Sequence, residues 1–176
     1  MDRNISDVAG TLLDDCALLQ GYYDIKVYRA DGTFESRSVK NVVTAAGLNR
    51  IARQAITPTG SPFNWIAVGS QTAAHSLDST QAGIGEVIRK SAASAVQSRE
   101  WFSLQCTIGG AADSVTSVAL DTAAMMTCPV SYAITANSGG VMGNAANGLG
   151  VTLGGSDLLD LTVRIRVGSH NLSHST

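Results

Sequence analysis

Residues 159–167 alternate strictly between apolar and polar side chains, and this pattern constrains the fold more than any other in the chain. The apolar positions are Leu159, Leu161, Val163, Ile165 and Val167, and the polar positions between them include Thr162, Arg164 and Arg166. Because successive side chains of a strand point to opposite faces, the alternation predicts a strand with one face in a core and the other in water. Residues 99–108 alternate in the same way, with Trp101 on the polar side.

A β-hairpin is predicted at 22–39. Asp31-Gly32 separates two strand-like stretches, 22–29 and 33–39, and this dipeptide readily supplies the positive φ that tight hairpin turns need. Further short strands are expected at 63–69, 115–120 and 129–134, whereas 83–97 fits either a helix or a strand followed by a loop. Short strands separated by turn signals predict a mainly β fold, an antiparallel β-sandwich of jelly-roll-like type.

Two short helices are expected beside the strands. Over 6–20 the apolar residues recur at spacings of three and four, which predicts an amphipathic helix ending at Gly21; they are Val8, Leu12, Cys16 and Leu19. Thr44 is expected to cap a second helix that Pro58 ends. The predicted organisation is an N-terminal helical arm over 1–20, a β-sandwich domain over 21–168 and a flexible tail over 169–176. Leu12 and Leu19 are then candidate attachment residues of the arm.

The segment 137–156 is rich in Gly, Ala and Asn and is predicted to be a long loop. It contains apolar residues that a solvated loop does not need, and these are candidate anchors in a groove of an adjacent subunit: Val141, Met142, Leu149, Val151 and Leu153. An ordinary surface loop or an intramolecular hairpin is the alternative interpretation.

The charge of the chain argues against a nucleic-acid partner. The net charge is −2 with a pI near 5.8, and only 15% of residues are charged, compared with about 25% in typical soluble domains. No Lys or Arg stands between Arg99 and Arg164, so that segment offers no cations to replace the counterions of a phosphate backbone. Apolar runs of membrane-spanning length are also missing from the sequence, so no membrane partner is expected.

We expect no catalytic, cofactor-binding or metal-binding residues. The segment starting Gly83-Ile84-Gly85 has Ile88 where a dinucleotide-binding loop needs its third glycine. His170 and His174 belong to the expected tail, and Cys16, Cys106 and Cys128 are too widely spaced for a metal or redox motif, so they are expected to be small buried residues. The first residues lack the layout of a signal peptide, so synthesis in a reducing cytoplasm is expected.

Trp65 and Trp101 are the two candidate aromatic platforms. Trp65 lies within an expected buried strand and is assigned to core packing. Trp101 lies on the polar side of its strand, which favours a lateral contact between subunits, with a sugar-binding site as the alternative.

The order of these segments resembles that of structural proteins of tailed bacteriophages. In that family a hairpin leads into a motif matched here by Asn41-Val42-Val43-Thr44-Ala45-Ala46-Gly47-Leu48-Asn49-Arg50-Ile51-Ala52. A strand matched by Trp65-Ile66-Ala67-Val68-Gly69 follows, then a polar loop over 78–89 with Glu86, and finally the alternating strand 161–167. The chain departs from the family at Ser117-Val118-Ala119-Leu120, where an acidic residue and a Gly-Leu or Gly-Ile pair are usual.

The resemblance implies a non-enzymatic β-sandwich subunit of a virion, assembled in the host bacterial cytoplasm. A capsid decoration or cement protein is the first expectation, with the major capsid protein, other virion proteins and copies of itself as partners. A tail, adaptor or fibre component is the second. A carbohydrate-binding module that uses Trp101 is a third possibility, from another functional class.

Overall fold

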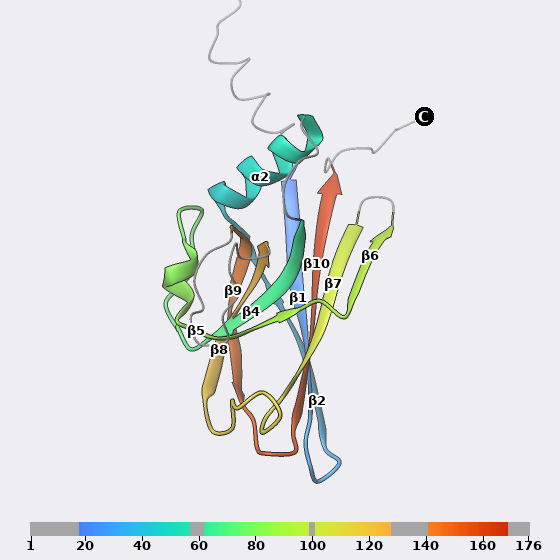
Figure 1. The fold of residues 1–176 in the computed structure, drawn as a ribbon, viewed down its shortest axis with the longest axis vertical. Helices are drawn as coiled ribbons and strands as arrows, with labels where there is room; N and C mark the ends of the chain where they lie inside the picture. The colour runs from blue at the N-terminus through green and yellow to red at the C-terminus, as the bar shows by residue number, and fades with distance from the viewer. Residues whose placement is uncertain (1–17, 57–61, 99–100, 128–140, 169–176) are drawn as a thin grey trace, which may run out of the picture.

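The computed structural model describes residues 18–56, 62–98, 101–127 and 141–168 (Figure 1). In these residues the chain is mainly β and forms two antiparallel five-stranded sheets, the α-helix α2 (Ala45–Ile56) and the short 3-10 helix η1 (Gln81–Ile84). The prediction of a mainly β antiparallel fold is therefore confirmed.

Sheet A contains the first and the last strand of the described chain. Its order is β2-β1-β10-β7-β6. The strands are β1 (Leu18–Tyr28), β2 (Phe34–Lys40), β6 (Ser94–Ser98), β7 (Trp101–Gly109) and β10 (Leu158–Gly168). β1 and β2 form the predicted hairpin, in which Gly32 has a φ of 85° and its amide donates to Arg29 O at 3.0 Å.

Sheet B has the order β3-β9-β8-β4-β5. Its strands are β3 (Val42–Val43), β4 (Phe63–Gly69), β5 (Glu86–Ser91), β8 (Ala119–Thr127) and β9 (Met142–Thr152). The chain passes from sheet B to sheet A at Ala92 and Ala93, whose amides donate to Asn64 O and Gln105 O, respectively.

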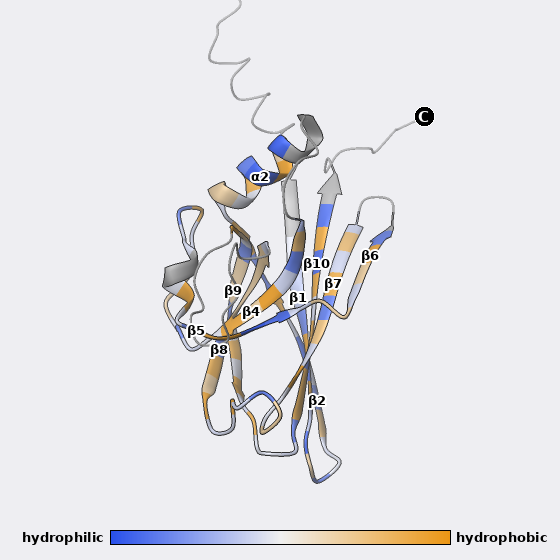
Figure 2. Cartoon of the chain, in the orientation of Figure 1, coloured by the Kyte–Doolittle hydropathy of each residue, from blue (hydrophilic) through white to orange (hydrophobic). Residues whose placement is uncertain are grey.

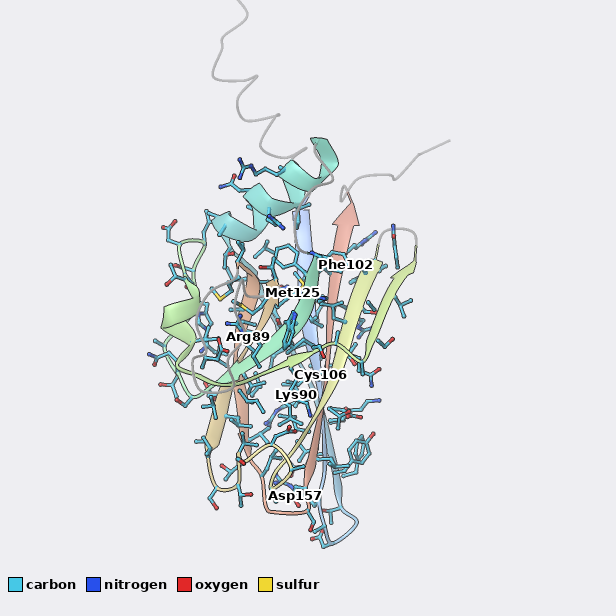
Figure 3. The ribbon with its side chains drawn as sticks, in the orientation of Figure 1. Arg89, Lys90, Phe102, Cys106, Met125 and Asp157 are labelled. Atoms are coloured by element: carbon cyan, nitrogen blue, oxygen red, sulfur yellow. The ribbon has the colours of Figure 1, made fainter. Side chains whose placement is uncertain are left out.

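Side chains of both sheets form one hydrophobic core. Ile25 and Cys106 of sheet A belong to the same buried cluster as Val68 and Met125 of sheet B, and Figure 3 labels Cys106 and Met125 among the side chains of the two sheets. The hydroxyl of Tyr23 also donates to Asn144 Oδ1 at 2.6 Å, from one sheet to the other. The two sheets therefore share this core between them.

A second buried cluster lies on the other face of sheet B. It contains Ala67, Ile84, Ala124, Met126, Met142 and Ala145, with Trp65 packed against it. The assignment of Trp65 to packing is confirmed. Sheet B is thus covered on both faces in this region, which explains why residues 123–126 of β8 are a continuous apolar run rather than an alternating one.

The predicted long loop over 137–156 is wrong for most of its length. Residues 142–152 form β9, which pairs with β8 on one side and β3 on the other. Small residues at 143–147 suit this interior position because a side chain at Gly143 would meet Met125 and Phe63. The positive φ values of Gly148 (85°) and Gly150 (50°) accompany a register shift between Leu120 and Thr122, so these glycines form an irregularity within the strand pair.

α2 is the second predicted helix, and Thr44 caps it as expected. The Thr44 hydroxyl oxygen accepts a hydrogen bond from Gly47 N at 3.0 Å and donates to Met142 O at 2.5 Å. A Cβ at Gly47 would collide with Gly143 O, so the helix backbone lies directly against β9. Figure 2 shows hydrophilic residues on the side of α2 turned away from the sheets.

Other sequence-based boundaries need correction. Leu18, Leu19 and Gln20 belong to β1, so the predicted N-terminal helix cannot extend to 20, and Gly21 lies inside a strand instead of ending a helix. The rest of that helix, the strand at 129–134 and the tail at 169–176 lie outside the described residues. The strand expected at 115–120 begins only at Ala119, and the ambiguous stretch 83–97 contains the end of η1, all of β5 and most of β6.

Candidate functional site

The outer face of sheet A carries an exposed row of large apolar side chains at its hairpin end. Tyr28 stands opposite Phe34 on β2 and opposite Leu158 on β10, so the three residues cross three adjacent strands. Their exposed fractions are 41% for Tyr28, 53% for Phe34 and 45% for Leu158. The rings of Tyr28 and Phe34 have centroids 5.2 Å apart. We call these three residues the apolar row.

The alternation of the strands explains why the row faces outward. Tyr23, Ile25 and Val27 of β1 point into the core, so the residues between and after them, including Tyr28, point away from it. Leu158 likewise precedes the buried Leu159 on β10. Beyond the row, the outer face is mostly polar, as in the pairs Lys26–Asp160 and Asp24–Thr162.

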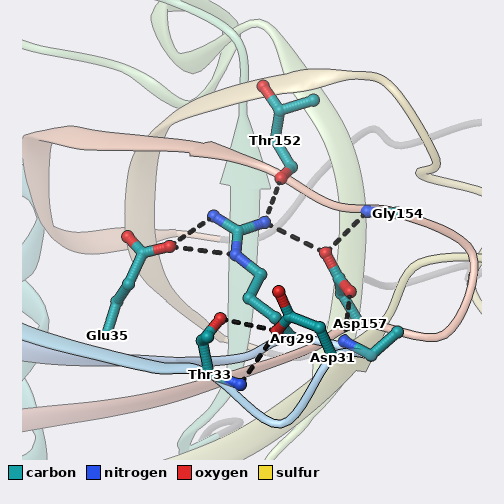
Figure 4. Close-up of polar contacts among 8 residues, drawn as sticks. Arg29, Asp31, Thr33, Glu35, Thr152, Gly154 and Asp157 are labelled. Carbon is teal, nitrogen blue, oxygen red and sulfur yellow. Dashed lines mark hydrogen bonds and ion pairs between the residues drawn. The ribbon is translucent and has the colours of Figure 1, made fainter.

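A polar cluster centred on Arg29 lies next to the apolar row (Figure 4). The Arg29 guanidinium donates to Glu35 Oε1 from Nε at 2.9 Å and from Nη2 at 2.8 Å. Its Nη1 donates to Asp157 Oδ2 at 3.0 Å and to Thr152 O at 2.6 Å. One side chain therefore joins β2, the end of β9 and the turn before β10. We call Arg29, Glu35 and Asp157 the Arg29 cluster.

Two backbone amides also donate hydrogen bonds to the Asp157 carboxylate. Its Oδ2 accepts from Gly154 N at 2.8 Å, and its Oδ1 accepts from Ala30 N at 2.9 Å. These hydrogen bonds, with that from Gly154 foremost, lower the pKa of Asp157, while the hydrogen bond to Glu35 is the main cause that raises the pKa of Arg29. The pKa of Asp31 is also lowered, chiefly by the hydrogen bond from the Thr33 hydroxyl.

The Arg29 cluster borders an open pocket of about 420 Å³, lined by Arg29, Ala30, Asp31, Thr33, Glu35 and Asp157. The lowered pKa values of Asp31 and Asp157 favour their ionised forms further, so these residues offer hydrogen-bond acceptors and negative charge rather than a proton to donate. Sites for small organic ligands are mainly apolar, which this pocket is not. In the described residues, no three His, Cys, Asp or Glu side chains are grouped to hold a metal ion.

The Arg29 cluster and the apolar row lie at the same ends of the strands. Arg29, Glu35 and Asp157 are the immediate sequence neighbours of Tyr28, Phe34 and Leu158, respectively. By fixing the positions of the first three residues, the hydrogen bonds also fix the backbone that carries the apolar row. The arrangement is suited to presenting a preorganised apolar surface to a partner.

Trp101 lies on the same outer face, near the other end of sheet A. It is 37% exposed and stands opposite Arg166, whose guanidinium carbon is 5.9 Å from the indole centroid. The predicted outward position is therefore correct. The arginine contacts one face of the indole, which leaves less of that face for stacking on a sugar ring.

The other sequence-predicted interface residues are not gathered with Trp101. Met142, Leu149, Val151 and Leu153 are buried within the subunit's own core, so the proposal that they anchor a loop in an adjacent subunit is corrected. Val141 is half-buried just before β9. Leu19 belongs to β1 rather than to a helix, and Leu12 lies outside the described residues.

Sequence reasoning missed the apolar row. The sequence does contain a pattern that indicates it, because Tyr28 and Phe34 lie on either side of the Asp31-Gly32 turn, at outward positions of the two hairpin strands. Leu158 is an apolar residue in a position where the alternation of 159–167 calls for a polar one.

Comparison of the chain with protein-family models, with curated proteins and with solved structures gives no match. Among the described residues, no helix has the length and apolar character needed to cross a membrane.

Proposed function

We propose that this chain is a non-enzymatic structural protein of a tailed-phage virion. In this proposal it is a capsid decoration protein that binds the major capsid protein on the outer shell and stabilises contacts between capsid subunits. The observation that carries the proposal is the apolar row, a group of exposed large side chains whose strand ends are joined by the hydrogen bonds of the Arg29 cluster. The resemblance of the motifs at 41–52, 65–69 and 161–167 to those of virion proteins supplies the identity of the partner.

The physical basis is burial of the apolar row. Each large side chain that moves from water into a contact contributes about 1.5–3 kcal/mol when burial is complete. Contacts of this size are modest for one subunit, but a shell repeats them over many copies, and repetition turns modest affinities into strong avidity. Because burial of apolar surface is screened little by salt, we expect shell binding to depend weakly on ionic strength.

Two finer expectations belong to the same proposal. The jelly-roll-like connectivity stays a prediction; the pairing of the first strand β1 with the last strand β10 in one sheet favours it. An N-terminal helical arm over the residues before Leu18 also stays a prediction, as a second point of attachment to the shell.

The test uses virion shells that lack this chain, purified after deletion of its gene from the phage that encodes it. Wild-type protein is added back, and bound copies are counted by co-sedimentation and located by electron microscopy. We expect saturable binding at positions that repeat with the shell lattice. The Phe34→Ser/Leu158→Ser variant should bind about 10-fold or more weakly, because the exposed row loses two apolar side chains.

A matched control is Gln105→Ser, an exposed substitution on the same face away from the row, which should bind like the wild type. Circular dichroism checks that each variant is folded. Absence of wild-type binding to shells would overturn the decoration role, and binding confined to tails would establish the tail or adaptor alternative instead.

Sugar binding by Trp101 is the remaining candidate, favoured by the exposure of this indole on an open sheet face. It predicts that oligosaccharides from the host cell surface quench Trp101 fluorescence and that Trp101→Ala abolishes binding. Unchanged fluorescence across a panel of such sugars would exclude it.

A further inference from the structure

The two sheets present four edge strands, and three of them are protected against pairing with another chain. β3 is only two residues long. β2 carries Glu35, Arg37 and Lys40, and β5 carries Glu86, Arg89 and Lys90. Short length and charged side chains are the devices by which natural sheets prevent their edges from pairing.

β6 has neither protection. Its sequence is Ser-Ala-Val-Gln-Ser, and the whole stretch 91–98 contains no charged residue and no proline. It pairs with β7 on one side and ends the strand order of sheet A on the other, so no strand in the described part of the chain covers its outer edge. Five residues is an ordinary strand length, long enough to pair with another strand.

Both faces of β6 are open as well as its edge. Residues 94–97 are exposed, and Val96, on the outer face, is 54% exposed. On the inner face, Gln97 stands opposite Phe102 of β7, which is only partly buried. Figure 3 labels Phe102 near the α2 end of β7.

We propose that β6 pairs antiparallel with β6 of a second copy of this chain. The two five-stranded sheets then join edge to edge around a twofold axis. This surface is separate from the apolar row, so the inference goes beyond the proposed function and does not depend on it.

The sequence of β6 favours a second copy as the occupant. In a twofold antiparallel pair, the register that uses all five residues sets Val96 against Val96, Ala95 against Gln97 and Ser94 against Ser98. None of these pairs places like charges together, which is what destabilises self-pairing at charged edges. The exposed Val96 side chains of the two copies meet at the axis, where each covers apolar surface of the other.

The pairing is expected to be weak in solution. Five paired residues are a small contact compared with the about 1,200–2,000 Å² that stable protein interfaces bury in total. A monomer–dimer equilibrium in the micromolar to millimolar range is therefore expected, and it would be strengthened wherever copies are held close together on a surface.

The test measures self-association of the full chain by sedimentation equilibrium over a range of protein concentrations. Wild-type protein should form a dimer as concentration rises. Val96→Lys places two lysines against each other at the axis and should weaken dimerisation at least 10-fold. The matched control is Ser36→Lys on the exposed β2 edge of the same sheet, which should leave the dimerisation constant unchanged.

A Val96→Cys variant tests the register, because directly opposed residues have Cβ atoms about 4.5–5.5 Å apart, close enough for a disulfide after small adjustments. Mild oxidation should link two copies through position 96, and peptide mass spectrometry identifies the linkage against the parent chain treated in the same way. Protein that stays monomeric at about millimolar concentration would overturn the proposal. So would a dimer that is weakened by Phe34→Ser and not by Val96→Lys.

Failure of this test leaves the decoration role standing, since shell binding is measured separately with variants of the apolar row. Conversely, a Val96-dependent dimer that binds no shell would support the pairing and overturn the decoration role.

Discussion

Tyr23 and Asn144 place polar atoms in the middle of an otherwise apolar core. Asn144 Oδ1 accepts hydrogen bonds from the Tyr23 hydroxyl at 2.6 Å and from Met125 N at 3.3 Å. Tyr23 is fully buried, and desolvation is the main reason that its pKa is raised well above the ordinary value. A buried hydrogen bond of this kind fixes how the two sheets are aligned, because sliding would leave the Tyr23 hydroxyl without its acceptor and Asn144 Oδ1 with only the longer bond from Met125 N.

We predict that Tyr23→Phe lowers the free energy of unfolding by about 1–2 kcal/mol, since it removes the donor and leaves Asn144 Oδ1 with the longer bond alone. Urea denaturation followed by fluorescence measures the change. Tyr22→Phe, on the outer face of the same strand, is the matched control and should change stability little. Equal losses for the two variants would show that the hydrogen bond between the sheets contributes nothing specific.

Cys106 is predicted to resist alkylation in the folded protein. Burial raises the pKa of its thiol to about 12, so almost none of it is the reactive thiolate at pH 8. Iodoacetamide labelling with peptide mass spectrometry should show Cys106 protected in buffer and labelled in urea. Because the folded pKa lies above the unfolded one, the thiol contributes stability that falls as pH rises from about 9 toward 12. Rapid labelling of Cys106 at pH 8 without denaturant would contradict this assignment.

At the scale of elements, local patterns predicted most of sheet A. β1, β7 and β10 each have one face in the core and one in water, and this arrangement produces a two-residue period in the sequence. β2, which is exposed along most of its length, was predictable from the Asp31-Gly32 turn that pairs it with β1. α2 was also predictable because Thr44, its capping residue, acts through contacts within one turn. Such signals depend on near neighbours and need no knowledge of the rest of the fold.

β9 was not predictable for the opposite reason. Gly143, Asn144, Ala145 and Ala146 are small or polar because of what lies around them: α2 on one face, and Phe63, Met125 and Tyr23 on the other. From composition alone, these residues are predicted to form a loop. The same limit applies to the candidate site, where the outward position of Trp101 followed from alternation but the apolar row emerged only when three strands were set in register.

The contact between α2 and β9 predicts that a Gly→Ala substitution in this helix lowers stability instead of raising it. Gly→Ala inside a helix normally stabilises it by up to about 1 kcal/mol. At Gly47 we expect destabilisation by about 1–3 kcal/mol, because the new methyl group would collide with Gly143 O and push the helix away from the strand. Thermal unfolding measures the change, with Asn49→Ala on the exposed side of α2 as the control. A stabilised Gly47→Ala variant would contradict the close approach.

At the scale of the whole molecule, the described core draws its buried side chains from Tyr23 near the start of β1 to Ile165 near the end of β10. We therefore predict that a chain beginning at Leu18 folds cooperatively, with a sharp calorimetric transition close to that of the full chain. A chain beginning at Lys26 should not fold, because it loses Tyr23 and Ile25 and most of the pairing of β1 with β10. Loss of cooperativity on removing 1–17 alone would show that this segment belongs to the core.

The pairing of β1 with β10 also determines how the molecule could be connected to other chains. Leu18 stands opposite Gly168, at the end of sheet A remote from the turn at Asp31-Gly32 (Figure 1). Cargo fused before β1 or after β10 would thus leave from one pole of the body while the hairpin pole stays uncovered. The same neighbourhood suits circular permutation, in which a short linker joins these two points and new ends are opened at an exposed turn.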